Sequence, residues 1–148
     1  MPNKFRFDVV LSNFKREEIV LAKKIANANK NYFLGSFKKQ SWQGKQWKEV
    51  KRRIPGTYEY KYPMKRGLSR RTKPILVGKG ILRRAVTKSV KSVTPKSIRF
   101  VVELPYANAH NDGTAIMPKR QYMGWNKDID KINRDLIRQS MVRVFKRK

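Results

Sequence analysis

Apolar residues recur at intervals of three and four positions near both ends of the chain, which is the pattern of amphipathic helices. The first helix is predicted from Glu17 to about Phe37, and Gly35 is expected to end or loosen it. The second helix is predicted to begin at a cap formed by Asn126 or Asp128 and to run to about Val144. The residues expected on the two buried faces are Ile19, Ala22, Ile25, Ala26 and Phe33 in the first helix, and Ile129, Ile132, Leu136 and either Met141 or Val144 in the second.

Alternating apolar and polar residues predict strands outside these helices. Phe5 to Leu11 alternates loosely, which favours a first strand or an extended arm. A hairpin is predicted from the strands Ser89–Val93 and Ser97–Leu104, joined by a turn at Thr94 and Pro95.

Two shorter segments complete the expected fold. Gly78–Thr87 predicts a short helix, and Tyr106–Gly113 predicts a compact turn. The fold class expected is therefore α+β. It consists of a small antiparallel sheet packed by an N-terminal and a C-terminal helix, in a single domain over residues 1–148.

Residues 38–73 form a long basic segment without a clear period, rich in aromatic residues and broken by glycine and proline. A loop of this length in a compact domain is unusual and tends to be functional. Its aromatic and basic residues suit stacking on bases and contact with phosphates, but they also suit a loop that folds against a neighbouring subunit. Both interpretations stay open. The candidate interaction residues are Trp42, Trp47, Lys51, Arg52, Arg53, Tyr58, Tyr60, Arg66, Arg70 and Arg71.

The balance of charge narrows the choice of partner. The chain has 37 Lys and Arg against 10 Asp and Glu, which gives a net charge of +27. Because this self-repulsion disfavours a compact monomer at low salt, we expect nucleic acid, an acidic protein or an anionic membrane to neutralise it. The chain has no cysteine, so disulfides and thiolate metal sites are excluded. No apolar run reaches the length of a membrane span, and the N-terminus does not resemble a signal peptide, so we expect a soluble protein without a membrane partner.

Residues that usually carry catalysis are scarce. His110 is the only histidine, and neither a cysteine nor a serine in a nucleophile motif accompanies it. One histidine cannot form a zinc site of three or four ligands, and Asp128, Asp130 and Asp135 fit helix capping and ion pairing better than a two-metal site. The glycine patterns of phosphate-binding loops are absent. We expect no enzyme activity, metal or cofactor, with a small hydrolase centred on His110 as a remote alternative.

Three segments carry a resemblance to a known family. Residues 106–113 read YANAHNDG, residues 117–124 read MPKRQYMG, and residues 75–86 read ILVGKGILRRAV. Their order and spacing, after an N-terminal helix and before a C-terminal one, resemble the phage virion morphogenesis family. These are the Mu G-like tail-completion and head–tail joining proteins of tailed bacteriophages. This chain has Lys79 where the family pattern usually has Thr, and Tyr122 and Met123 where it has Phe and Leu.

The resemblance implies a structural virion protein that joins head and tail in the neck or terminates the tail. Such a protein acts in a homo-oligomeric ring, whose interfaces must be heterologous and close on themselves. Its expected neighbours are portal or adaptor and tail proteins, with packaged DNA as a further candidate. Its expected location is the neck or tail of the virion, and the host cytoplasm during assembly.

The motif residues also make physical sense as a scaffold. Gly113 and Gly124 suit backbone positions with positive φ, Arg120 suits hydrogen bonds to carbonyls or an acid, and Tyr106 and Tyr122 suit packing beneath it. The residues expected to hold the fold are Gly80, Leu82, Tyr106, Ala107, His110, Gly113, Pro118, Arg120, Tyr122 and Gly124.

Composition alone favours a different function, a basic nucleic-acid-binding protein that is ribosome-associated or packages DNA. Positive charge is densest in residues 38–91, outside the motifs of residues 106–124. We therefore expect the basic region to meet an acidic neighbour or DNA, and the motif-bearing half to hold the fold.

Overall fold

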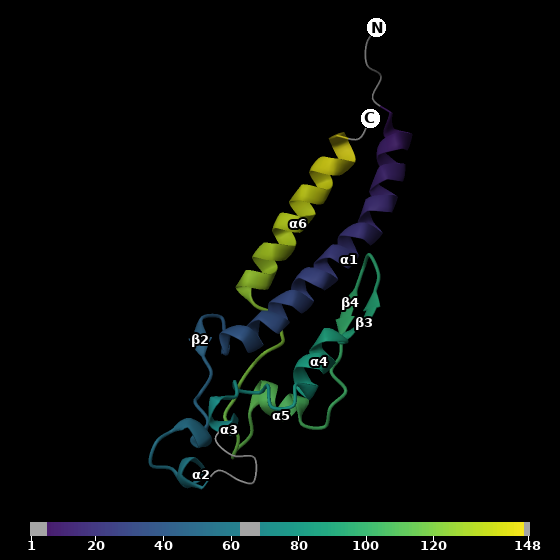
Figure 1. Ribbon diagram of the computed structural model, residues 1–148. Helices are drawn as coiled ribbons and strands as arrows, with labels where there is room; N and C mark the ends of the chain where they lie inside the picture. The colour runs from purple at the N-terminus through teal and green to yellow at the C-terminus, as the bar shows by residue number, and fades with distance from the viewer. Residues whose placement is uncertain (1–5, 63–68, 147–148) are drawn as a thin grey trace. The chain divides into compact units, whose positions relative to one another are not determined.

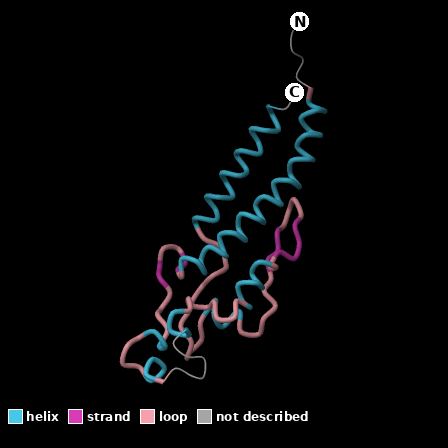
Figure 2. The backbone as a smooth tube through the Cα atoms, viewed as in Figure 1, coloured by secondary structure: helices cyan, strands magenta, loops and turns pink. Residues whose placement is uncertain are grey.

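The structure, a computed structural model, describes residues 6–62 and 69–146, without the side chains of residues 69 and 70. The fold is α+β, as predicted: helices dominate, and two small antiparallel sheets of two strands each accompany them (Figures 1 and 2). The chain forms two compact units, one of Met1–Asn31, Val90–Val101 and Trp125–Lys148, the other of Tyr32–Ser89 and Val102–Gly124. The predicted single domain stays a prediction, and each unit is described by itself.

The first unit is built from two helices and a hairpin. It contains α1 (Phe7–Lys39) up to Asn31, the strands β3 (Val90–Val93) and β4 (Ile98–Phe100), and α6 (Lys127–Lys146). In Figure 1, α6 runs antiparallel to the N-terminal part of α1, and the hairpin lies beside α1.

The side chain of Asn126 caps α6 as predicted. Its Oδ1 accepts a hydrogen bond from the backbone N–H of Ile129 at 2.8 Å, which satisfies one of the N–H groups that the first turn of a helix leaves without a partner. The cap therefore fixes where α6 begins.

A buried carboxylate links α1 to α6. Oε1 of Glu17 accepts a hydrogen bond from the hydroxyl of Ser140 at 3.0 Å and pairs with Arg143 at 3.4 Å. Lys24, two turns along α1, lies 3.9 Å from the same oxygen. Glu17 and Ser140 are both buried, and the hydrogen bond between them gives each a partner, as buried polar groups require.

The second unit has a more irregular backbone around an aromatic core. Phe37, near the end of α1, packs against Trp47 and Tyr122 with ring centroids 5.8 and 5.2 Å away. The elements of this unit, besides the end of α1, are β1 (Ser41–Trp42), β2 (Lys45–Gln46), the 3-10 helix η1 (Lys51–Arg53), α2 (Tyr58–Lys61), α3 (Ser69–Thr72), α4 (Ile81–Thr87) and α5 (Ala107–Asp112).

The N-terminal helix differs from its prediction at both ends. It begins at Phe7, so the strand expected at Phe5–Leu11 is wrong over its described part, and it continues through Gly35 to Lys39. Of the predicted buried face, Ala22, Ala26 and Phe33 are buried, whereas Ile19 is exposed.

The later elements follow the predictions more closely. The hairpin turn forms at Thr94–Ser97, where the Thr94 N–H donates to the Ser97 carbonyl at 2.8 Å, but β4 ends at Phe100 rather than Leu104. In α6, Val144 and not Met141 is buried. The turn expected at Tyr106–Gly113 is instead the short helix α5.

Candidate functional site

The two motif segments of residues 106–113 and 117–124 fold against each other. Oδ1 of Asn111 accepts the backbone N–H groups of both Tyr122 and Met123 at 3.1 Å. The Arg120 N–H donates to the His110 carbonyl at 2.9 Å, and the Tyr122 hydroxyl donates to the carbonyl of Ala107 at 3.1 Å. The motif therefore forms one hydrogen-bonded structure, in which Tyr122 is fully buried.

The motif also anchors the segment that follows β2. Nε of Arg120 donates to the Lys48 carbonyl at 3.1 Å, and the indole N–H of Trp47 donates to the Gln121 carbonyl at 2.8 Å. Burial lowers the pKa of Arg120 and raises the pKa of Tyr122 to about 12. At neutral pH Arg120 is charged and Tyr122 is neutral, so both donate hydrogen bonds within the fold.

Gly113 fills a position where the backbone leaves no room for a side chain. Its φ is +81°, and a Cβ there would lie 2.9 Å from the Lys119 nitrogen. Gly124 also has positive φ, at +144°. Both glycines thus meet the expectation that these positions need a conformation that other residues avoid.

The segment of residues 75–86 supplies further core residues. Gly80 precedes α4 with a φ of +76° and donates to the Val77 carbonyl. Leu82 and Val86 face inward from α4 and are buried. Pro118 is partly buried, near the start of the second motif segment. These positions agree with the expected scaffold role, which stays a prediction.

His110 lies within the first motif segment, in the helix α5. Its ring contacts Tyr106 edge to face, with centroids 5.8 Å apart, and its Nδ1 is buried without a hydrogen-bond partner. Burial, and secondarily the charge of Arg120, lowers its pKa. Over residues 6–62 and 69–146, no group of three or more His, Asp and Glu side chains is placed to hold a metal ion.

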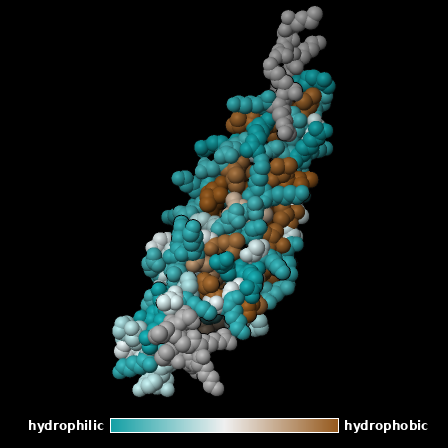
Figure 3. All heavy atoms as spheres, viewed as in Figure 1, coloured by the Kyte–Doolittle hydropathy of each residue, from teal (hydrophilic) through white to brown (hydrophobic). Residues whose placement is uncertain are grey.

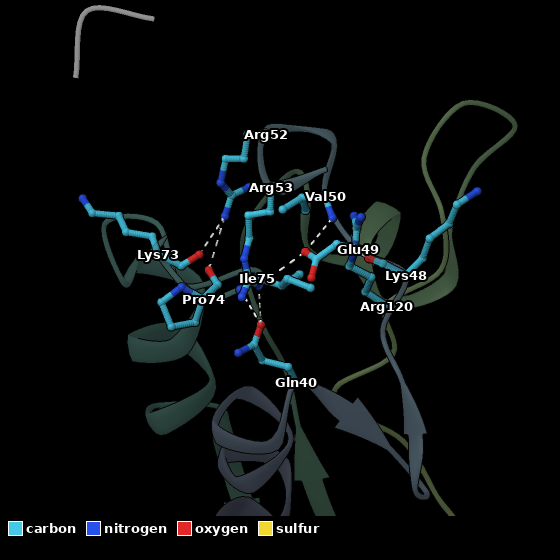
Figure 4. Close-up of polar contacts among 10 residues, drawn as sticks. All are labelled: Gln40, Lys48, Glu49, Val50, Arg52, Arg53, Lys73, Pro74, Ile75 and Arg120. Atoms are coloured by element: carbon cyan, nitrogen blue, oxygen red, sulfur yellow. Dashed lines mark hydrogen bonds and ion pairs between the residues drawn. The ribbon is translucent and has the colours of Figure 1, made fainter. Parts of the chain in front are cut away.

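Residues 51–62 and 71–73 are the described part of the basic segment that follows the buried Trp47, and we call them the basic arm. A bridge through Gln40 joins the arm to the end of α1 (Figure 4). Oε1 of Gln40 accepts the Ile75 N–H at 3.0 Å and the Arg53 guanidinium at 3.4 Å. Arg53 also pairs with Glu49 at 3.3 Å. On the other side of the arm, Arg52 donates to the carbonyl of Lys73 at 3.1 Å.

The tyrosines of the basic arm divide between two environments. The guanidinium of Arg71 lies over the Tyr60 ring, 4.2 Å from the ring centroid, in a cation–π contact. Arg71 also donates a hydrogen bond to the Tyr60 carbonyl. The rings of Tyr58 and Tyr62 contact each other with centroids 4.9 Å apart and planes tilted by 42°. Their exposed fractions are 73% and 63%, so α2 and the residue that follows it present an aromatic pair to solvent.

Two tryptophans expected in the interaction loop belong to the core instead. Trp42 packs against Tyr32 and Phe33, with centroids 5.5 and 6.3 Å away, and Trp47 packs against Phe37. Both are buried, so neither is free to contact a partner. Of the other candidates, Arg66 and the side chain of Arg70 lie outside the described residues.

Sequence reasoning missed residues that organise this site through polar side chains. Gln40 holds the basic arm and Asn111 holds the motif loop. Asn111 lies within the recognised motif, so its position gave a signal. Gln40 lies in a run of polar residues and gave no signal, because a single amide side chain forms no periodic pattern from which its hydrogen-bond partners could be predicted.

In the part of the chain that the structure covers, no helix is long and apolar enough to span a bilayer. No protein-family model, curated protein or solved structure matches the chain.

Proposed function

We propose that this chain is a structural virion protein of a tailed bacteriophage, which joins head and tail in the neck or terminates the tail as one subunit of a ring. The observation that carries the proposal is the use of the motif residues. The motif residues act within the fold. Tyr122, Arg120 and Asn111 make hydrogen bonds to other parts of the chain, and Gly113 adopts a backbone conformation that leaves no room for a side chain. Their role as a scaffold fits a protein that works through its surfaces.

The first unit adds support, because large apolar side chains are exposed on both of its helices. Phe7, Leu11 and Phe14 are exposed on α1, and Ile137, Met141 and Phe145 on α6. Figure 3 shows such apolar surface among hydrophilic residues over these helices. Large apolar side chains that gather on an exposed surface are typical of a site that binds another protein. This favours assembly over the alternative of a stand-alone nucleic-acid-binding protein.

The proposal is tested by inactivating the gene in its parent phage and imaging the lysate by electron microscopy. We expect DNA-filled heads and tails to accumulate separately, or tails of abnormal length, and a plasmid copy to restore infectious particles. Normal yields of infectious particles without the protein would contradict the proposal.

A complementation test with a variant protein distinguishes a role in assembly from a role in catalysis. We expect the variant His110→Gln to complement the defect, because His110 contributes packing and not chemistry. If a folded His110→Gln protein entered particles but left them inactive, the hydrolase alternative would be favoured.

A further inference from the structure

We propose that the basic arm binds the phosphate backbone of nucleic acid, with Lys51, Lys61 and Lys73 contacting phosphates and Tyr58 and Tyr62 contacting sugars and bases. The inference deepens the proposed function and rests on it only for the source of the nucleic acid in the particle.

The described residues of the basic arm are held by contacts among themselves. The Thr57 hydroxyl donates to the carbonyls of Lys51 and Ile54 at 2.6 and 2.9 Å, which ties the start of α2 to η1. Arg71 holds Tyr60 through its ring and its carbonyl. An arm fixed by its own contacts loses little conformational freedom when it binds.

The acids of the arm and its flank are already engaged, so its positive charge is available to a polyanion. Glu49 pairs with Arg53, and Glu59 pairs with Lys51 at 3.9 Å. The Lys51–Glu59 pair is exposed on both sides and weakly held. Lys61 and Lys73 have no acidic partner among the described residues, and residues 63–68 contain no Asp or Glu. Figure 4 shows the Lys73 side chain extending away from the polar cluster.

The composition of the arm's surface favours nucleic acid over an acidic protein. Protein interfaces have an apolar centre and are depleted in lysine. The described part of the arm lacks such a centre, because Ile54 is its only exposed large aliphatic side chain. Surfaces that bind nucleic acid combine lysine and arginine with exposed aromatic rings. Tyr58 and Tyr62 provide those rings beside Lys61.

The test measures binding of the whole protein to a duplex DNA and to single-stranded DNA of the same sequence, by fluorescence anisotropy across a salt series. An arm variant, Lys51→Gln with Lys61→Gln and Lys73→Gln, is compared with a control variant of equal charge, Lys23→Gln with Lys96→Gln and Lys131→Gln. All six lysines are exposed. We expect the arm variant to reduce the slope of log affinity against log salt by about 2 to 3, and the control by less than about 1.

The tyrosines give a separate readout. We expect Tyr58→Ser with Tyr62→Ser to weaken binding to single-stranded DNA by about tenfold or more, because each stacked base is lost, and to weaken duplex binding less. Melting temperatures of all variants, matched to the parent protein, exclude unfolding as the cause.

Three outcomes would overturn the inference. These are no binding of the parent protein to either DNA at about 0.1 M salt, equal loss in the arm and control variants, and competition by polyglutamate as effective as competition by DNA at equal charge. If the arm variant lost DNA binding but still complemented assembly, the inference would stand as a contact and the proposed function would also stand. An assembly defect in the gene test supports only the proposed function. The DNA contact is tested separately, by the anisotropy measurements on the purified protein.

Discussion

Gly113 is the residue whose replacement the backbone tolerates least. A Cβ there would lie 2.9 Å from the Lys119 nitrogen, and the φ of +81° adds strain to any other residue. We expect Gly113→Ala to lower the free energy of unfolding by about 2 to 4 kcal/mol, measured by urea denaturation. The matched control is Gly35→Ala, which lies inside α1 with nothing within 4 Å of the added Cβ. It should raise stability by about 0.5 to 1 kcal/mol, and equal losses in both would contradict the assignment.

We expect the free energy of unfolding to depend on pH through His110. Burial lowers its pKa in the folded state, so the unfolded chain binds the proton more readily. The stability that neutral His110 contributes is therefore full above its ordinary pKa of about 6.5 and is lost as pH falls through the lowered value. Unfolding measured between pH 7.5 and 5 should show this fall, and His110→Gln should flatten it. Because His110 is the only histidine, an unchanged pH profile in the variant would exclude this origin.

Among residues, the sequence allowed good predictions where the backbone itself imposed a requirement. Gly113 and Gly124 were identified from their place in the motif, and both have positive φ. Trp42 and Trp47 were misjudged, because aromatic residues in a segment without a period do not reveal whether they face solvent or core. Their burial depends on Phe33 and Phe37 of α1, a contact between segments that only the fold defines.

At the scale of elements, errors occurred where two patterns coincide. Phe5, Phe7 and Val9 alternate like a strand, but Phe7, Leu11 and Phe14 also follow helical spacing, and Asp8 suits the first turn of a helix. The helix forms, although these apolar residues are exposed. In α5, the asparagines are weak helix formers, and the contacts of Asn111 and buried Ala107 override that weakness. The hairpin and α6, whose patterns are unambiguous, form where they were predicted, although β4 ends at Phe100 and not at Leu104.

The pairing of α1 with α6 depends on Glu17. Its replacement by Ala leaves the buried hydroxyl of Ser140 without its acceptor and leaves Arg143 without its anion. We expect Glu17→Ala to lower the free energy of unfolding by about 1 to 3 kcal/mol. Glu18→Ala removes the same charge from the next position of α1, which is less buried, and should change stability by less than about 0.5 kcal/mol. Urea denaturation measures the free energy of unfolding of both variants. Equal losses in the two would show that the charge, and not the buried contacts of Glu17, is responsible.

At the scale of the whole molecule, the net charge predicts how stability depends on salt, which no single contact predicts. A net charge of +27 on 148 residues repels itself in the folded state more than in the expanded unfolded chain. Salt shortens the range of this repulsion from about 10 Å at 0.1 M to about 3 Å at 1 M. We therefore expect the melting temperature of the purified protein to rise by several degrees over that range, measured by circular dichroism in sodium chloride.

The same reasoning supplies the control for this salt effect. The variant with Lys23, Lys96 and Lys131 changed to Gln carries three fewer charges, so it should melt higher at 0.1 M salt and gain less on going to 1 M. A melting temperature that falls with salt would mean that ion pairs such as that of Glu17 with Arg143 outweigh the net repulsion. Because that pair is partly buried and weakly screened, we expect repulsion among the exposed lysines and arginines to prevail. A folded chain stabilised by screening is one that a polyanion would also stabilise, which connects the charge of the whole molecule to the contact proposed for the basic arm.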